Sequence, residues 1–478
     1  MVSDDGVRWR RLQDALAPPV PGNVGPHPYE WGEDCDGSLS FPEGAGPVIM
    51  FGPACDGHAP PRKGARGRRD NAIVAVARPA NVTDPYLTGW IKDPANPVAF
   101  AGKPCSFAGG VWKAPDGHYD MVCAVDGTWG RYSTADSTLH GPWALEDPHF
   151  TALQNGTGPS VGGKSGPSFL PLPDPGDGPT HIISDGAEAP LAFSFGRYDA
   201  ARQKMVISDD GGLGNILDHG DLQWSAAGVS HMPHDGRVLS VGWVFPGTGA
   251  PADPRCPRVK GIAICGIQAL SAVRIISYDA AVNRLVANPP SELARLRNAT
   301  LAAPENVTVA AGSVHPVAMG PAATAADVEL SIALPAAGAV SVGLRVLASG
   351  ADPKSGVTLV VTVGPPVAPA GTDTMPMRSA NVSLFTGEGG AYAVGEPGGE
   401  SSHTAAAGAA SFDVPAGETS VRVRALIDRS IVEFFAGNGR AVFTARTYPR
   451  PGSDRITVSS STGASVSVAV YEMGCGWA

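Results

Sequence analysis

The sequence predicts an all-β protein. Glycine and proline account for 61 and 45 of the 478 residues, which is typical of a chain rich in turns. Short apolar runs recur along the chain, each bounded by Gly, Pro, Asp or Asn. Charged residues make up only 17%, below the usual quarter, so much of the chain is available for buried sheets.

The first half contains strand-like runs separated by long loops. Their spacing fits either sheets repeated around an axis or sheets stacked in a sandwich, and no repeat of 20 to 50 residues decides between the two. The runs are Pro47–Phe51, Ala72–Ala77, Tyr119–Val125, His181–Ser184, Leu191–Phe195, Lys204–Ser208, Arg237–Phe245 and Val273–Tyr278.

The pattern changes around Pro289–Pro304, which we interpret as a linker. Ser291–Arg297 predicts one short helical turn within it, with Ser291 as N-cap. The alternating runs that follow predict an antiparallel β-sandwich. They are Asp327–Leu334, Ala339–Ala348, Val357–Val363, Val421–Ile427, Ser430–Phe435, Ala441–Tyr448, Arg455–Ser460 and Ser465–Tyr471.

One hairpin carries a specific turn signal. Ser430–Phe435 and Ala441–Tyr448 are joined through a segment that contains Asn438 and Gly439. Asn-Gly permits positive φ at both central positions of a tight turn, so these two runs are expected to pair.

Composition argues against several classes of partner. The formal net charge is −10 and the pI about 5.5, and the single basic run, Arg62–Arg69, is expected to be a solvated loop, so we expect no nucleic-acid partner. No apolar run is long enough to span a membrane, and the acidic start of the chain does not match a signal peptide.

The sequons hint at secretion, and the cysteines allow disulfides if the chain is secreted. Five N-x-Ser/Thr sequons occur, at Asn81, Asn155, Asn298, Asn306 and Asn381. The seven cysteines are scattered without a C-x-x-C pair, which argues against a zinc or redox motif and leaves one or two disulfides of unassigned pairing.

Several dissimilar segments, in order, resemble one family. Leu426–Pro449 is similar to the "IDxSIVESF…SRVYP" stretch of plant-type acid invertases (β-fructofuranosidases), which belong to glycoside hydrolase family 32. Ala80–Val98, Phe193–Asp199 and Gly266–Arg297 resemble further segments of the same enzymes. The resemblance implies a five-bladed β-propeller over residues 1–295 that carries the active site, followed by a β-sandwich over 305–478.

The resemblance also implies a chemistry. These glycosidases remove terminal β-D-fructofuranosyl units from sucrose and fructans with retention of configuration, using a nucleophilic carboxylate and a carboxylic acid. A third carboxylate holds sugar hydroxyls, and no cofactor or metal is implied. The family's "WxNDPNG" nucleophile motif is absent. Val2–Trp9 resembles a segment that follows it, so we expect a truncated gene model with an incomplete first blade. A leader in the missing part would make the protein secreted, to the cell wall or vacuole.

The other two carboxylates are missing from within the chain. Ala108–Gly110 stand where the family has Arg-Asp-Pro, and Ser165 stands where it has the acid/base Glu. Serine has no suitable pKa for a proton donor. Glu188, the nearest downstream Glu, is interpreted as a solvated loop residue. We therefore predict no catalytic residue in the chain as written.

Three residues match substrate-contacting positions of the family. Asp218 matches the Asp of "RYDYGKFYA", although Asp221 replaces the Lys of that motif. Asp36 and Ser38 match the segment "WTGS", in which Cys35 replaces the Trp. The alternative for Asp218 is a turn residue before a glycine.

The remaining candidates have structural alternatives that we favour. Gly158–Gly162 matches G-x-S-x-G but lies in a Gly/Pro loop rather than between a strand and a helix. His231 and His234 flank a proline at an expected hairpin turn, and Glu433 is expected to be structural or interfacial. Tryptophans that stack on sugars are more often packing residues in a propeller. The tryptophans concerned are Trp112, Trp224 and Trp243.

Three functional hypotheses follow. The chain derives from a complete β-fructofuranosidase, or it is a pseudoenzyme that binds sucrose or fructan oligosaccharides without turnover. A third hypothesis, a glycosidase with relocated carboxylates, has no direct support in the sequence. The oligomeric state stays open.

Overall fold

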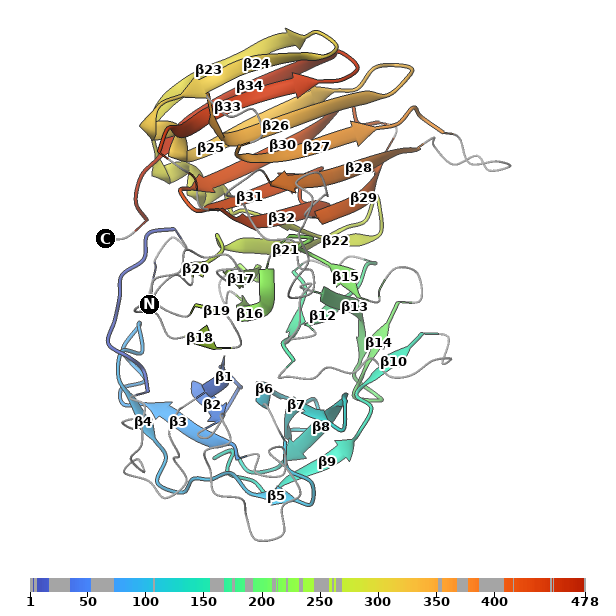
Figure 1. Ribbon diagram of the computed structural model, residues 1–478. Helices are drawn as coiled ribbons and strands as arrows, with labels where there is room; N and C mark the ends of the chain where they lie inside the picture. The colour runs from blue at the N-terminus through green and yellow to red at the C-terminus, as the bar shows by residue number, and fades with distance from the viewer. Residues whose placement is uncertain are drawn as a thin grey trace. The chain divides into compact units, whose positions relative to one another are not determined.

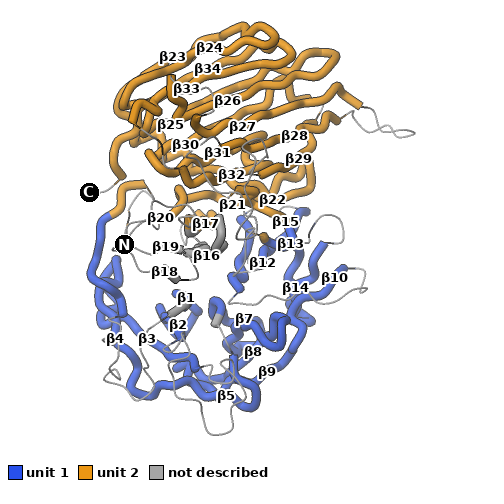
Figure 2. The backbone as a smooth tube through the Cα atoms, in the orientation of Figure 1, with its two compact units in different colours: residues 1–2, 10–187, 193–214 blue, residues 3–9, 188–192, 215–478 orange. Residues whose placement is uncertain are grey.

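The computed structural model describes most of the chain and shows it to be almost entirely β-strand (Figure 1). Two compact units are distinguished (Figure 2): unit 1 comprises residues 1–2, 10–187 and 193–214, and unit 2 comprises 3–9, 188–192 and 215–478. Described are residues 3, 7–16, 35–52, 73–105, 108–154, 167–173, 177–184, 192–208, 212, 214–220, 222–231, 235–244, 258–259, 262–263, 269–350, 355–367, 377–386, 408–415, 417–447, 449 and 451–476.

Unit 1 contains three sheets, each built on an antiparallel meander of four consecutive strands. This is the topology of a propeller blade. The first sheet has the order β1 (Cys35–Ser40), β2 (Val48–Gly52), β3 (Ala75–Pro79), β4 (Trp90–Lys92). The second has the order β5 (Phe100–Ala101), β9 (Trp143–Asp147), β8 (Thr128–Thr134), β7 (Tyr119–Val125), β6 (Ala108–Lys113). The third contains β10 (Thr151–Leu153), β14 (Lys204–Ile207), β13 (Ala192–Asp199), β12 (His181–Ser184) and β11 (Phe169–Pro171).

Unit 2 begins with a fourth sheet. It contains β16 (Leu222–His231), β17 (Val238–Val244), β21 (Arg274–Asp279) and β22 (Arg284–Asn288), with β20 (Ala269–Leu270) paired to β17. Shorter elements of this part are β15 (Asn215–Ile216), β18 (Arg258–Val259) and β19 (Ile262–Ala263). The predicted helical turn is the 3-10 helix η2 (Ser291–Leu296), in which Ser291 is the first helical residue rather than the cap.

The rest of unit 2 is a sandwich of two six-stranded antiparallel sheets. One sheet has the order β23 (Arg297–Val309), β34 (Ala464–Met473), β25 (Ala325–Ala333), β30 (Ser420–Asp428), β31 (Ile431–Ala436), β32 (Ala441–Arg446). The other has the order β24 (Ser313–Met319), β33 (Ser453–Ser460), β26 (Val340–Ser349), β27 (Val357–Val363), β28 (Met377–Thr386), β29 (Gly408–Pro415). A second 3-10 helix, η3 (Pro321–Thr324), precedes β25.

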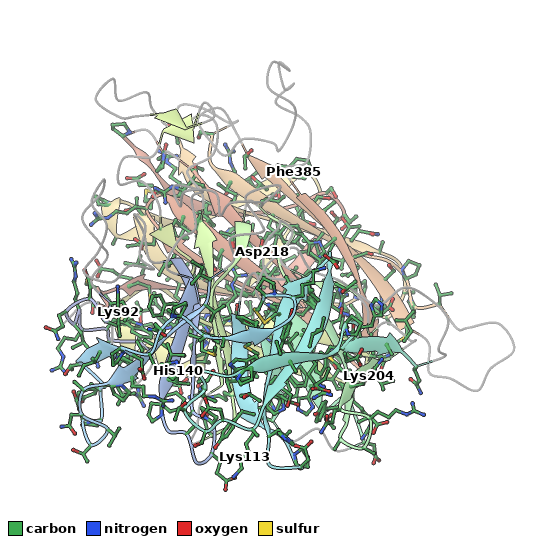
Figure 3. The ribbon with its side chains drawn as sticks, turned by 90° about the horizontal axis from the view of Figure 1, so that it is seen from below. Lys92, Lys113, His140, Lys204, Asp218 and Phe385 are labelled. Carbon is green, nitrogen blue, oxygen red and sulfur yellow. A yellow bond between two sulfur atoms is a disulfide. The ribbon has the colours of Figure 1, made fainter. Side chains whose placement is uncertain are left out.

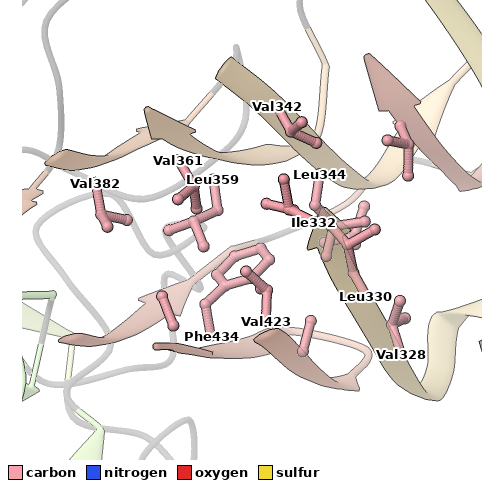
Figure 4. Packing of buried hydrophobic residues seen from close by; sticks show 14 of the residues in the cluster. Val328, Leu330, Ile332, Val342, Leu344, Leu359, Val361, Val382, Val423 and Phe434 are labelled. Carbon is pink, nitrogen blue, oxygen red and sulfur yellow. The ribbon is translucent and has the colours of Figure 1, made fainter. Parts of the chain in front are cut away.

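The sandwich is held together by the alternation of its strands. Buried and half-buried residues alternate strictly along Val357–Val363, so one face of β27 points into the core. Side chains from both sheets, including Leu344, Leu359 and Phe434, meet in a single hydrophobic cluster (Figure 4). The predicted Asn-Gly hairpin joins β31 and β32, and Gly437, Asn438 and Gly439 all have positive φ.

The domain boundaries at residues 295 and 305 stay a prediction, because the two compact units divide the chain at other residues. A single disulfide pair is described, Cys105–Cys123, and it is fully buried in unit 1. None of the described helices has the length and apolar character needed to cross a membrane.

An aromatic cluster ties the second and third sheets of unit 1 together. His181 stacks on Phe169 at 4.8 Å between ring centroids, and Tyr198 and Trp112 contact the same Phe169 ring. Burial lowers the pKa of His181 to about 4, from an ordinary value of 6.5. The imidazole is therefore neutral in the folded chain at neutral pH.

We expect His181 to make the protein sensitive to acid. Because its pKa is lower in the folded than in the unfolded chain, the unfolded chain binds the proton first. The stability that depends on a neutral His181 is thus present above about pH 6.5 and is lost as the pH falls toward 4. When the pH is lowered from 7 to 4.5, the free energy of unfolding should fall for both proteins. The fall should be smaller for His181→Phe than for the wild type, by about 1–2 kcal/mol. Urea denaturation at both pH values measures this difference. An exposed-site control, His149→Phe, should follow the wild type.

Candidate functional site

The sandwich sheet that ends in β32 would have an open edge, but a short segment of unit 2 covers it. Within Leu217–Gly220, the His219 N–H donates to the Val442 carbonyl at 2.8 Å, as a neighbouring strand would. A Cβ on Gly220 would lie 2.1 Å from the Thr444 carbonyl oxygen, so only glycine permits this close approach. An unpaired edge strand invites pairing with other chains, and this segment removes that opportunity.

Asp218 sits at the centre of this segment and is fully buried (Figure 3). Its Oδ1 accepts from the backbone N–H groups of Gly220, at 2.8 Å, and Thr444, at 3.1 Å. Its Oδ2 accepts from Arg274 Nη1 and from the Thr444 hydroxyl, both at 2.7 Å. All four acceptor positions of the carboxylate are therefore occupied by protein donors.

Arg274 connects Asp218 to a second buried carboxylate, Glu433. Its Nη2 and Nε donate to Glu433 Oε2 at 2.5 and 3.2 Å, and Nη2 also donates to the Thr444 hydroxyl at 2.6 Å. The Ala272 N–H donates to Glu433 Oε1 at 2.6 Å, and the guanidinium lies 5.4 Å from the centre of the Phe435 ring. Arg274 is 1% exposed and Glu433 is 3% exposed, so water does not screen these contacts.

The charge states follow from this geometry. Burial by itself would lower the pKa of Arg274, but the two carboxylates outweigh burial and raise that pKa, so Arg274 stays charged. Burial raises the pKa of Glu433, and the Arg274 charge opposes this effect. Glu433 lines a cavity of about 520 Å³ in unit 2, but every oxygen of both carboxylates already accepts a hydrogen bond from the protein, so the group is a structural ion network and not an acid–base pair.

The sequence prediction for Asp218 can be compared with this arrangement. The alternative role, a turn residue before a glycine, is realised in the hydrogen bond from the Gly220 N–H. The sugar-contacting role stays a prediction, and the fully occupied carboxylate weighs against it. Glu433 is structural, as expected from the sequence.

Asp36 and Ser38 lie together in β1 of unit 1. The Ser38 hydroxyl donates to the Gly109 carbonyl at 2.7 Å. Two residues further along the same strand, the hydroxyl of the buried Ser40 accepts from the Val111 N–H at 2.8 Å. These bonds fasten β1 to β6. The Asp36 side chain lies outside the described residues, so its sugar contact and that of Ser38 stay predictions.

Gly109 lies in the segment Ala108–Gly110, which the sequence resemblance predicts to replace the family's Arg-Asp-Pro motif. A Cβ built on Gly109 would lie 2.6 Å from two backbone oxygens, those of Val122 and Pro167. Pro167 lies two residues after the predicted acid/base position, Ser165. Both Ser165 and Gly166 lie outside the described residues. The backbone of Val122 and Pro167 therefore leaves no room for a side chain at position 109.

The other candidates divide into packing residues and residues that are not described. Trp112 packs against Phe150 and Phe169 in the aromatic cluster, as expected for a packing residue. His231 ends β16 at the predicted hairpin, although its side chain is not described. No cluster of His, Cys, Asp and Glu suited to a metal occurs among the described residues. Outside the described residues or side chains lie Glu188, His234, Trp224, Trp243, Asp221 and Gly158–Gly162.

Sequence reasoning missed the partners of Asp218. Arg274 lies in the apolar run Val273–Tyr278, and Thr444 lies in the hairpin strand β32. The one available signal was a charged residue inside a run that otherwise predicts a buried strand, because such a charge needs a buried partner.

Comparison with known proteins agrees with this architecture. Residues 292–472 match the family model described as "Glycosyl hydrolases family 32 C terminal". Over 94% of its length the chain is 25% identical to Beta-fructofuranosidase 1 of Zea mays, covering 68% of that protein. It is 26% identical, again over 94%, to a fructan 1-exohydrolase of Bromus pictus, covering 74% of it. The crystal structure of fructan 1-exohydrolase IIa from Cichorium intybus superposes with a TM-score of 0.70 at 20% identity, covering 99% of this chain and 88% of that one.

The fold is therefore a β-propeller followed by a β-sandwich, and the predicted fold class is confirmed. More specifically, residues 292–472 match the C-terminal domain of glycoside hydrolase family 32, and the chain as a whole is similar to β-fructofuranosidases and fructan exohydrolases.

The ion network predicts a large effect of a single substitution. Arg274→Met leaves Asp218 and Glu433 buried without a counter-charge, which should lower the free energy of unfolding by about 3–5 kcal/mol. Arg422→Met, at an exposed position of the sandwich, should change it by less than about 0.5 kcal/mol. Guanidinium denaturation of both variants measures the difference. Equal stability of the two would show that the network does not hold the sheets together.

Proposed function

We propose that this chain binds β-D-fructofuranosyl saccharides, such as sucrose and fructan oligosaccharides, without hydrolysing them by the retaining mechanism of its family. The recognition half of this proposal is supported by the relatives, which include a β-fructofuranosidase and fructan exohydrolases. A structural neighbour, a variant of the Cichorium intybus exohydrolase, was crystallised in complex with 1-kestose.

The proposal that the chain does not hydrolyse its ligand rests mainly on the surroundings of Gly109. Retaining hydrolysis requires two carboxyl groups about 5–5.5 Å apart on either side of the glycosidic bond, with further groups to hold the sugar. At Gly109 the carbonyl oxygens of Val122 and Pro167 occupy the space that the side chain of a stabilising Asp would need. Asp218 and Glu433 do not replace the missing groups, because both are buried and bound to Arg274.

We further propose that the protein is secreted and glycosylated. The buried disulfide Cys105–Cys123 favours an oxidising compartment. Among the sequons, Asn81 lies in an exposed loop, where its Oδ1 accepts from both the N–H and the hydroxyl of Thr83, at 3.0 and 2.8 Å. Asn81 is itself exposed, so its side chain is accessible to the enzyme that attaches a glycan.

The proposal predicts binding without turnover. The purified chain should bind 1-kestose saturably in calorimetry and should release no fructose from sucrose or 1-kestose above a buffer blank. The exohydrolase of Cichorium intybus, assayed in parallel, is the positive control for the substrates. Fructose release that persists through repeated purification would overturn the pseudoenzyme reading and leave a hydrolase with relocated carboxylates.

Substitutions at two adjacent glycines test whether the backbone around Gly109 excludes a side chain. Gly109→Asp should lower the free energy of unfolding by about 1–3 kcal/mol or prevent folding, because its Cβ meets two backbone oxygens at 2.6 Å. Gly110→Asp is the matched control, since the nearest atom to its Cβ is the Ser40 hydroxyl oxygen at 3.7 Å. Thermal melts of both variants decide the point. If Gly109→Asp folds normally and gains fructose release, the site is open and the proposed closure is wrong.

A further inference from the structure

A polar cavity of about 660 Å³ lies in unit 1, away from the positions that the family motifs occupy. It is formed by the turn before β7, the end of β8, the start of β9 and the turn between β13 and β14. The residues on which the argument depends are Asp116, Arg131, Ser133, Asp136, Glu146 and Gln203.

Strand register separates this cavity from Gly109. Ala108 pairs with Cys123 at one end of the second sheet, whereas Lys113 (labelled in Figure 3) pairs with Tyr119 at the other. Tyr119 in turn pairs with Thr134, which lines the cavity. The cavity therefore lies at the strand ends opposite Gly109.

The wall of the cavity contains a buried cation with an unused donor. Arg131 is 8% exposed, and its Nη1 donates to both oxygens of the fully buried Asp120 at 3.3 and 3.1 Å. Its Nε is buried and has no hydrogen-bond partner among the described residues. Arg131 also lines the cavity, so the wall there carries a cation whose hydrogen-bonding capacity Asp120 uses only in part.

The charges around the cavity define the kind of ligand. Asp116, Asp136 and Glu146 outnumber Arg131, so an anion would be repelled. The described His, Cys, Asp and Glu side chains form no metal-binding group. What remains are mixed donors and acceptors: a guanidinium, carboxylates, the hydroxyl of Ser133 and the amide of Gln203. This combination suits a neutral polyhydroxylated ligand, whose hydroxyls both donate and accept.

We propose that this cavity is a second saccharide site, which binds one sugar unit of a neutral oligosaccharide on the face of unit 1 remote from Gly109. The choice of a fructosyl saccharide as probe rests on the proposed function, whereas the location rests on the cavity alone. Gln203 donates to Asp116 at 2.8 Å, so the site spans the second and third sheets of unit 1.

The test combines calorimetry with hydrogen exchange on the full chain, using 1-kestose as the ligand. Exchange protection is expected in peptides that span residues 114–146. The double variant Glu146→Ala/Gln203→Ala removes two polar groups at the surface of the cavity and should weaken binding there about ten-fold. Glu305→Ala, an exposed Glu on β23 of unit 2, is the matched control and should bind like the wild type.

The outcomes separate this site from the proposed function. Protection confined to peptides around Ser38 and Gly109, with unchanged affinity in the double variant, overturns the second site and leaves the proposed function standing. Fructose release together with protection at 114–146 overturns the proposed function and supports the second site. Absence of any 1-kestose binding overturns both.

Discussion

The guanidinium of Arg274, fixed between the carboxylates of Asp218 and Glu433, is the interaction on which unit 2 depends. It joins the segment that covers the sandwich edge, strand β21 of the fourth sheet and strand β31 of the sandwich. Two buried negative charges share one positive charge, and this is tolerable only because backbone N–H groups and the Thr444 hydroxyl supply the remaining donors. The fourth sheet and the sandwich consequently form one compact unit rather than two.

The close contact between the fourth sheet and the sandwich also explains why glycine is required at particular positions near Arg274. Gly220 approaches Thr444 and Gly408 approaches the His219 carbonyl oxygen, at distances that no Cβ could share. Gly439, at the tip of the β31–β32 hairpin, approaches the Ala287 carbonyl oxygen with a φ of +82°. The Asn-Gly turn therefore does more than close a hairpin: the Gly439 carbonyl accepts from the Ala287 N–H at 3.2 Å and ties the tip to β22. Local turn chemistry and packing of the two sheets impose the same residue.

Sequence patterns predicted strands where apolar residues dominate a short run, and missed a strand in which polar residues dominate. Val357–Val363 and Tyr119–Val125 have the same bounds in the sequence prediction and in the structure. Thr128–Thr134 was missed, because its buried face includes Arg131, whose charge is matched by Asp120 on the neighbouring strand. The motif also identified Asp218, but its bond to Thr444 crosses 226 positions of sequence. A single sequence carries no signal for a pairing at that distance, so the function of the carboxylate could not be predicted from its motif.

The proposed loss of the catalytic carboxylates and the presence of Asp218 are both consistent with how each residue contributes to stability. Catalytic carboxylates stand in strained, desolvated surroundings and commonly reduce stability, so their replacement is tolerated by the fold. Ala108–Gly110 even allow β1, β6 and the Pro167 backbone to close together through direct contacts. Asp218 has the opposite effect on stability, because its removal would leave Arg274 and the edge of β32 without a partner. Retention of a family substrate residue is therefore no sign of a working pocket here, since the scaffold alone is sufficient reason to retain it.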